Sequence, residues 1–172
     1  MDFLLVGRET KRLAFREVRP TDFEDWLPFH QDKRTSEFWE GLSLNPIEAC
    51  EQDLERTFYR YKNRLGGKNA VLLKETGQLI GQCGLLLQNV DGQKELEIGY
   101  SILPEYWKKG FATEAAIKCK QHAKKNKLAK TLISIIQVNN IPSQKVALAN
   151  GMVLEKTTTY HKNLVHIFRV RL

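Results

Sequence analysis

The strongest constraint on the fold is a change of periodicity at Gly110. Before this glycine, short apolar runs bounded by turn residues occupy Ala70–Leu73, Leu79–Leu87 and Leu96–Ile102. Such runs predict β-strands, and the short connections between them favour antiparallel pairing. After Gly110 the apolar residues recur at helical spacing, at Ala112, Ala115, Ala116, Cys119 and Ala123. This spacing is typical of an amphipathic helix, so a strand leads through a glycine into a helix.

The flanking segments complete a mixed pattern of strands and helices. The N-terminal part predicts a strand at Leu13–Val18, a short helix, a polar stretch at Asp32–Gly41 and a second helix from Asn45 to about Leu65. The C-terminal part predicts, in order, Thr131–Val138 as strand, Pro142–Ala149 as helix, and Met152–Tyr160 and Val165–Val170 as strands. We therefore expect an α/β (α+β) fold with a mixed, mostly antiparallel central sheet flanked by helices.

Residues 1–172 are expected to form one domain, because a chain of 172 residues can bury a core without disulfides or metals. Its 42% hydrophobic and 27% charged residues are ordinary for a soluble protein. No apolar run is long enough to cross a bilayer, and the first residues do not resemble a signal peptide. A cytoplasmic location without membrane attachment is expected. The three cysteines are far apart and not in metal-ligand spacing, so no metal is expected.

The junction at Trp107–Thr113 is the segment most indicative of chemistry. Gly110 allows a close approach to the backbone, and the amides at a helix start have no intrahelical acceptor. Such a helix start binds pyrophosphate, and Lys108 and Lys109 add positive charge to it. A plain strand–loop–helix connection is the alternative interpretation. The segment lacks the second glycine and the Gly-Lys-Ser/Thr ending of a Walker loop, and it lacks the three-glycine dinucleotide fingerprint.

A second constellation, Asn139–Ser143, lies at the end of a predicted strand and the start of the next helix. Asn140 in this place is typical of a helix N-cap, and Ser143 is typical of a first helical turn. Because this junction comes about one strand–helix unit after the first, an extended ligand bound at Gly110 would pass it next.

Both constellations resemble the motifs of a known family. Glu97–Ala115 is similar to the acetyl-CoA motif of the GNAT-superfamily N-acetyltransferases, and Asn140–Met152 is similar to the motif downstream of it. The resemblance extends from Leu13 to Val170 and is nearest to the RimJ/RimL-type ribosomal-protein N-acetyltransferases. It implies a GNAT-like sheet in which a splayed pair of strands admits the pantetheine arm of acetyl-CoA.

The resemblance also implies which residues bind the cofactor. Backbone groups near Ile102 and Leu103 would pair with the pantetheine arm, and Asn140 and Ser143 would contact the cofactor further along. The pyrophosphate would be held by the amides of Lys108, Lys109, Gly110, Phe111, Ala112 and Thr113. Two positions depart from the pattern. Trp107 replaces the Arg or Gln of the wider superfamily, and Lys108 replaces a glycine common in the Rim-like branch, which predicts a stiffer and more basic loop.

Three catalytic groups are sought for acetyl transfer to an amine. Glu97 is the candidate general base, since the resemblance puts a glutamate beside the thioester; a merely hydrogen-bonded strand carboxylate is the alternative. A backbone N–H near Leu103 is the expected oxyanion donor. Many superfamily members have a tyrosine that serves as the general acid where this chain has Ala147. Ser143 is the candidate substitute acid, although a cap role alone, or a thiolate leaving without an acid, is left open.

The sequence thus predicts an N-acetyltransferase that moves an acetyl group from acetyl-CoA to a protein N-terminus or a small-molecule amine. A non-catalytic acyl-CoA-binding or regulatory domain is the alternative. The net charge of +7 also suits nucleic acid, but no recognition helix or stacking aromatics accompany it. Homodimerisation is expected by analogy. Phe38 and Trp39 are expected near the acceptor groove, or else in a lid or the core. Glu37 and Glu40 are either attractants for a cationic amine or plain solvated carboxylates.

Overall fold

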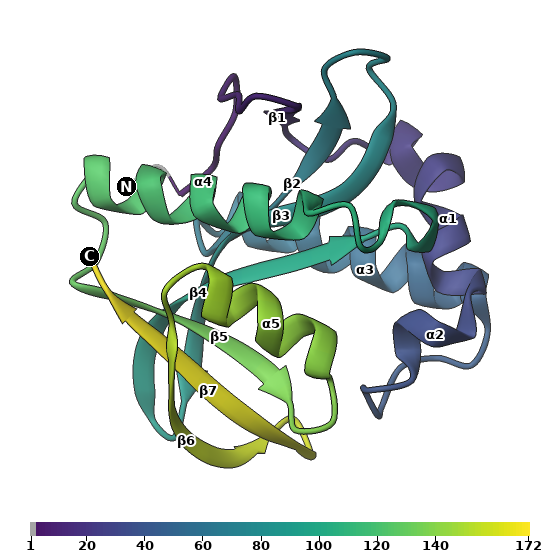
Figure 1. Cartoon of the computed structure of the whole chain (residues 1–172). Coiled ribbons are helices and arrows are strands. Elements are labelled where there is room, and N and C mark those ends of the chain that lie inside the picture. The colour runs from purple at the N-terminus through teal and green to yellow at the C-terminus, as the bar shows by residue number, and fades with distance from the viewer. Residues whose placement is uncertain (1–2) are drawn as a thin grey trace.

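The computed structural model describes residues 3–172 and contains one seven-stranded sheet in the order β1-β2-β3-β4-β5-β7-β6 (Figure 1). The strands are β1 (Leu13–Arg16), β2 (Gly66–Leu73), β3 (Leu79–Val90), β4 (Gln93–Ile102), β5 (Thr131–Gln137), β6 (Val153–Tyr160) and β7 (Asn163–Arg171). The helices are α1 (Phe23–Gln31), α2 (Lys33–Ser36), α3 (Pro46–Lys62), α4 (Phe111–Lys125) and α5 (Ile141–Ala149). Only β4 and β5 are parallel neighbours among these strands.

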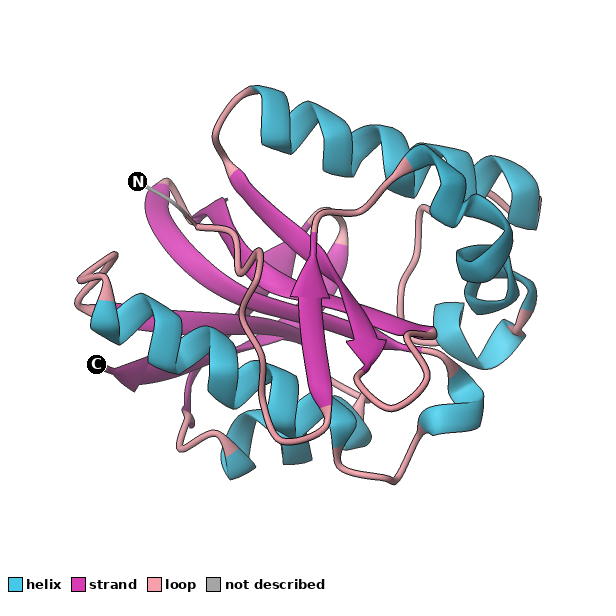
Figure 2. Ribbon diagram, turned by 90° about the horizontal axis from the view of Figure 1, so that it is seen from above, coloured by secondary structure: helices cyan, strands magenta, loops and turns pink. Residues whose placement is uncertain are grey.

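The helices form a layer on each face of the sheet (Figure 2). We call the face covered by α1, α2 and α3 the α3 face, and the face covered by α4 and α5 the α4 face. The α4 face buries the larger apolar core, with Leu85, Ile98 and Phe168 against Ala115 of α4. The α3 face buries a second core around Trp26. In the described part of the chain, no helix combines the length and the apolar character that a membrane span requires.

The predicted α/β fold with a mostly antiparallel sheet is confirmed, including the passage from strand to helix at Gly110. Helix α3 ends at Lys62, slightly before the expected Leu65, and Arg64 then takes a φ of 55°. Gly66, expected to end the helix, instead opens β2. A Cβ at Gly66 would lie 2.1 Å from the Leu85 carbonyl oxygen, so the close pairing of β2 with β3 requires glycine there.

Strands β4 and β5 diverge in the centre of the sheet. They pair at a single position, where Glu97 lies opposite Ile133. One residue further on, the Ser134 hydroxyl donates to the Ile98 carbonyl at 2.9 Å, so a side chain takes the place of the next main-chain bond. The splayed strands that the sequence led us to expect are therefore β4 and β5, and the gap opens toward the C-terminal end of β4.

Candidate active site

The segment Trp107–Thr113 leads from the end of the β4–α4 connection into α4, and two of its residues have left-handed backbone conformations. Lys108 has a φ of 61° and Gly110 a φ of 80°, and α4 begins at Phe111. The first helical hydrogen bond runs from the Glu114 amide to the Gly110 carbonyl at 3.0 Å. The amides of Phe111, Ala112 and Thr113 consequently have no acceptor within the helix. Three converging amides at the positive end of a helix dipole fit a phosphate group.

Gly110 is needed for its backbone conformation rather than for space. A Cβ built on it would meet only the Arg12 guanidinium, at 3.4 Å. Arg12 is held there by an ion pair with Glu114, with 2.6 Å between Nε and Oε2, and it donates to the Lys109 carbonyl at 3.0 Å. The Lys108 and Lys109 side chains are exposed. Sequence reasoning missed Arg12, because no local pattern shows that β1 starts beside this loop.

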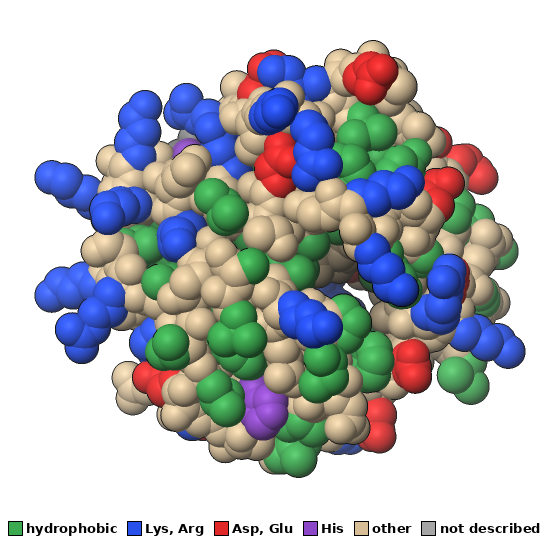
Figure 3. Space-filling model, in the orientation of Figure 1, with side chains coloured by type: hydrophobic (Ala, Val, Ile, Leu, Met, Phe, Trp, Pro, Cys, Tyr) green, Lys and Arg blue, Asp and Glu red, His purple; other side chains and the backbone are tan. Residues whose placement is uncertain are grey.

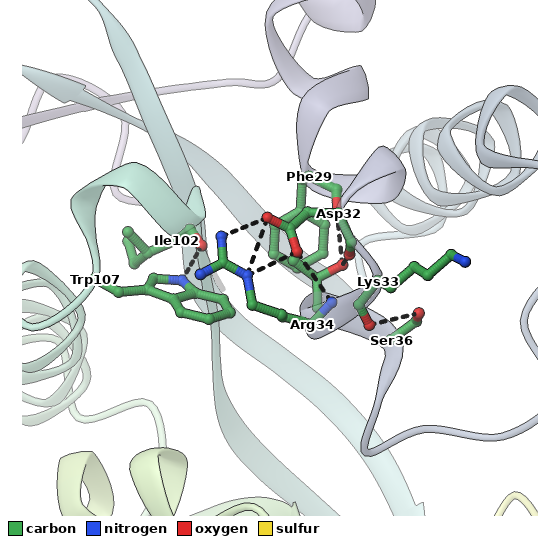
Figure 4. A network of polar contacts seen from close by, with 8 residues as sticks. Phe29, Asp32, Lys33, Arg34, Ser36, Ile102 and Trp107 are labelled. Carbon is green, nitrogen blue, oxygen red and sulfur yellow. Dashed lines mark hydrogen bonds and ion pairs between the residues drawn. The ribbon is translucent and has the colours of Figure 1, made fainter.

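Trp107 connects the same loop to α2 (Figure 4). The Arg34 guanidinium lies 5.1 Å from the centre of the Trp107 ring and forms an ion pair with Asp32 at 2.6 Å. The indole Nε1 donates to the Ile102 carbonyl at 2.6 Å. A carbonyl oxygen has two lone pairs, so Ile102 retains capacity for a second donor. Trp107, which departs from the pattern of the wider superfamily, therefore braces the end of β4 against α2.

Ile102 and Leu103 differ in the direction of their main-chain groups. The Leu103 amide donates to the Ile80 carbonyl of β3 at 2.9 Å. Because alternate residues of an antiparallel strand bond the same neighbour, the main-chain groups of Tyr100 and Ile102 point instead to the gap beside β5. The Leu103 amide is thus engaged with β3, so the oxyanion donor expected near Leu103 would be a neighbouring amide. The gap-facing groups of Tyr100 and Ile102 are better placed.

Asn140 and Ser143 lie together across the gap at the start of α5. The Asn140 Oδ1 accepts from the Ser143 amide at 3.1 Å, so Asn140 is the N-cap of the helix. The Ser143 hydroxyl donates to the Tyr100 hydroxyl at 3.0 Å, and the Tyr100 hydroxyl donates to the Ser143 carbonyl at 2.8 Å. Burial raises the pKa of Tyr100, which keeps its proton. The sequence analysis did not single out Tyr100. The available signal was the alternation of side chains along the strand, which puts Tyr100, three residues after Glu97, on the opposite face.

Glu97 lies on the α3 face, at the point where β4 and β5 separate. Its carboxylate accepts from Gln88 Nε2 at 2.6 Å and from the Ile135 amide. Burial raises the pKa of Glu97, although Gln88, the Lys68 ammonium and the Arg60 guanidinium work against this rise. A carboxylate with a raised pKa is a better proton acceptor near neutral pH. Glu97 and the Ser143–Tyr100 pair thus lie on opposite faces of the sheet, on either side of one gap.

A cluster of polar side chains surrounds Glu97 on the α3 face; we define the α3-face cluster as Asp53, Arg60, Lys68, Glu97 and Ser101. The Lys68 ammonium donates to the Ser101 hydroxyl at 3.1 Å. Asp53 accepts from the Trp26 indole at 2.9 Å and lies 3.5 Å from His30 Nε2. Burial opposes ionisation of Asp53, but Lys68, His30 and Trp26 together hold its pKa well below the usual range.

The segment between α2 and α3 crosses to the hairpin of β6 and β7. The Glu40 amide donates to the Asn163 side chain at 2.8 Å, and the Trp39 and Tyr160 rings lie 6.4 Å apart. Trp39 thereby packs on a small apolar core around Ile133. Phe38 is half-buried, whereas Glu37 and Glu40 are exposed.

Figure 3 shows a hollow in the surface between α2, α5 and the end of β4, with Lys and Arg side chains around it. Within residues 3–172, no group of three His, Cys, Asp or Glu side chains is arranged to hold a metal ion.

Comparison with known proteins gives consistent results. Residues 12–153 match the family model described as an acetyltransferase (GNAT) domain. An uncharacterized N-acetyltransferase of Bacillus subtilis, YnaD, is 29% identical over 143 residues, which span 83% of this chain and 80% of YnaD. A second uncharacterized protein of that species, YkkB, is 34% identical over 84 residues, and the alignment spans only 49% of each chain.

Solved structures agree with the fold. An acetyltransferase from Agrobacterium tumefaciens superposes with a TM-score of 0.82 at 23% identity, covering 100% of this chain and 98% of that one. The ribosomal-protein-S5-alanine acetyltransferase from Vibrio fischeri superposes with a TM-score of 0.72 at 18% identity, covering 96% of each chain. At such identities the likeness establishes the shared architecture.

Proposed function

The chain belongs to the GNAT acetyltransferase family and is an acyltransferase, and we propose that it transfers an acetyl group from acetyl-CoA to a primary amine. The observation that carries the proposal is the gap between β4 and β5, with Glu97 on one face and the Ser143–Tyr100 pair on the other. A thioester in this gap would have a proton acceptor on the side of the amine and hydroxyl donors on the side of the sulfur.

The residues around the gap fit acetyl-CoA. The amides of Phe111, Ala112 and Thr113, with Gly110, Lys108, Lys109 and Arg12 beside them, would hold the pyrophosphate. The main-chain groups of Tyr100 and Ile102 would pair with the pantetheine arm along the open edge of β4. The Asn140 Nδ2, which is not used by the cap bond, would donate to the cofactor. Acetyl-CoA would supply the activated acyl group as a thioester.

Within this arrangement the protein moves two protons. Glu97 takes one from the amine nitrogen, directly or through water, when the nitrogen attacks the carbonyl. The Ser143 hydroxyl, which donates to Tyr100 in this structure, would turn its hydrogen toward the leaving sulfur and protonate it, and water would return a proton to Ser143. A gap-facing amide of β4 stabilises the negative charge on the carbonyl oxygen. An α-amine, with an ordinary pKa near ~8, is partly neutral at physiological pH and needs less help from Glu97 than a lysine near ~10.4.

The acceptor, the branch and the assembly belong to the same proposal. Assignment to a RimJ/RimL-like branch is supported by the ribosomal-protein-S5-alanine acetyltransferase of V. fischeri, because the superposition covers nearly the whole chain. A protein N-terminus or a small-molecule amine is the proposed acceptor. A cytoplasmic location and a homodimer remain predictions from the sequence.

Thiol release with acetyl-CoA tests the proposal. The purified protein is incubated with acetyl-CoA and a panel of short peptides, amino compounds, polyamines and aminoglycosides, and free CoA is followed with a thiol reagent. At least one amine is expected to stimulate release, with the acetylated product confirmed by mass spectrometry. If CoA raises the melting temperature but no amine stimulates release, the non-catalytic alternative replaces the enzyme.

A further inference from the structure

Lys68 has an unusual place on the α3 face of the sheet. In the pairing of β2, β3 and β4, Lys68 lies opposite Gly84, and Gly84 lies opposite Gly99. The two glycines add no side chain of their own to this row, although Leu86 and Glu97 lie over Gly99. The lysine reaches Ser101 on β4, where its ammonium donates to the hydroxyl at 3.1 Å.

The Lys68 ammonium is only partly used by the protein. Among residues 3–172, its one hydrogen bond goes to Ser101, and no carboxylate lies within 4.0 Å of its nitrogen. An ammonium has three N–H donors, so two are left for a ligand. Arg60, on the neighbouring helix, likewise has a buried Nε without a hydrogen-bond partner in the described chain. Two cations of the α3-face cluster thus have donors to spare.

The carboxylates of the cluster are, by contrast, already engaged. Asp53 accepts from the Trp26 indole, and Glu97 accepts from Gln88 and the Ile135 amide. A second positive group on an acceptor would meet the Lys68 ammonium beside carboxylates that already accept hydrogen bonds from the protein. The cluster is suited to a compound that brings its own negative charge.

The spacing limits the size of that compound. Glu97 and Ser101 are four residues apart on β4, which is about 13 Å between their Cα atoms. The Glu97 side chain reaches over Gly99, where a Cβ would come within 3.9 Å of its carboxylate. The remaining interval suits an amine and an anionic group separated by a few bonds.

Resting on the proposed acetyl transfer, we infer that the acceptor is a small primary amine that carries an anionic oxygen group, whose carboxylate or phosphate is bound by Lys68 while its amine faces Glu97. Polycationic amines, such as polyamines and aminoglycosides, are poor acceptors by the same geometry.

Matched pairs of acceptors test the inference. Glycine is compared with glycinamide, O-phosphoethanolamine with ethanolamine, and both pairs with spermidine. Acetylation is measured at a common concentration of neutral amine, and binding to the CoA-saturated protein is measured by calorimetry. One anionic member is expected to exceed its neutral partner by about tenfold or more in both measurements, as a charged hydrogen bond would give. The pair that shows the preference identifies carboxylate or phosphate.

Variants assign the preference to the residue. Lys68→Met is expected to abolish the anionic preference, Lys68→Arg to retain most of it, and Lys94→Met, on the exposed start of β4, to leave it intact. A CoA-induced thermal shift equal to the unsubstituted protein's shows that each variant is folded. Equal or better acetylation of neutral amines or spermidine by the unsubstituted protein overturns the inference and leaves acetyl transfer standing. Failure of every amine, with CoA still bound, overturns both.

Discussion

The two faces of the sheet around the gap are built in different ways. On the α4 face, a run of seven consecutive residues, Trp107–Thr113, presents main-chain amides at the start of α4. On the α3 face, the α3-face cluster consists of side chains from one helix and two strands, which are held by partners on further elements. The first site depends on backbone conformation at Gly110, whereas the second depends on charges that hold one another in place.

This difference explains what each site does well. Amides at a helix start can bind a phosphate with little dependence on neighbouring side chains, so the proposed cofactor site should tolerate departures such as Trp107 and Lys108. Charged side chains distinguish acceptors, because each is oriented by a particular partner, as Glu97 is by Gln88. A proposed cofactor site built from main-chain groups is thus combined with an acceptor side that can change by single substitutions.

The largest effect is expected from Gly110→Val. A β-branched residue at a φ of 80° is strained by about 1–2 kcal/mol or more, and relief of that strain moves the amides of the loop. We expect the CoA-induced rise in melting temperature, and with it the activity, to be lost while circular dichroism stays native. Lys108→Ala and Lys109→Ala should reduce CoA affinity by only a few fold each, since screened surface charges contribute about 1 kcal/mol or less.

Gly77→Val is the matched control for this prediction. Gly77 has a φ of 73° and open space around it in the turn between β2 and β3, so it carries the same strain far from the cofactor. That variant should keep the full response to CoA. If the two lysine variants abolished binding and Gly110→Val did not, the cofactor side would depend on side chains and the contrast between the faces would disappear.

The next largest effect is expected from Glu97→Gln. Loss of a general base should lower kcat by about 10²–10⁴-fold and leave the CoA-induced thermal shift unchanged. Because the pKa of Glu97 is raised, the carboxylate is protonated at pH values where an ordinary glutamate is still charged. The rate of the unsubstituted enzyme should therefore fall, on acidification, above the usual glutamate range near 4.5, and the variant should lack this acid limb.

Glu95→Gln, on the same strand, separates this role from a general effect of removing a carboxylate. Glu95 forms an ion pair with Arg169 at 2.7 Å, so its loss should reduce stability but preserve the acid limb of kcat/KM. An acid limb that survives in Glu97→Gln would show that another group is the base.

The sequence indicated the local features of the site far better than its contacts between distant strands, for a physical reason. The loop at Gly110 and the cap at Asn140 are local features, and each is visible within a few consecutive residues. Tyr100, Lys68 and Arg12 become functional neighbours only after pairing of distant strands. The sequence predicts an oxyanion donor near Leu103 without naming the amide, because it shows where a strand ends but does not reveal which alternate amides face which neighbour.

A smaller effect, on stability, is expected from Asp53→Asn. The Asp53 side chain is 19% exposed and holds Trp26, so its loss should destabilise the fold by about 1–3 kcal/mol at pH 7, measured by urea unfolding. The pKa of Asp53 is lowered from its ordinary 3.8, so its contribution is complete above that value and is lost as the pH falls further. The unsubstituted protein and Asp53→Asn should therefore converge in stability at the lowest pH.

Asp91→Asn, in an exposed pair with Lys156, is the control and should have a smaller effect on stability. An equal effect would contradict the structural importance of Asp53.

The smallest effect is expected from Tyr100→Phe, and it tests whether the two hydroxyls on the α4 face act together. The change keeps the ring and removes the hydroxyl that orients Ser143, a neutral hydrogen bond of about 1 kcal/mol, so kcat should fall about fivefold with KM for acetyl-CoA nearly unchanged. Ser143→Ala should lower kcat by a similar factor or somewhat more.

A double-mutant cycle of kcat measures whether the two hydroxyls act as one unit. If they do, the double variant should be no slower than Ser143→Ala. Tyr106→Phe is the control, because this tyrosine lies just before the Trp107–Thr113 segment and its hydroxyl has no partner in the described residues. Losses that multiply would mean that Tyr100 acts independently of Ser143, and the hydroxyl pair would then be a structural brace across the gap.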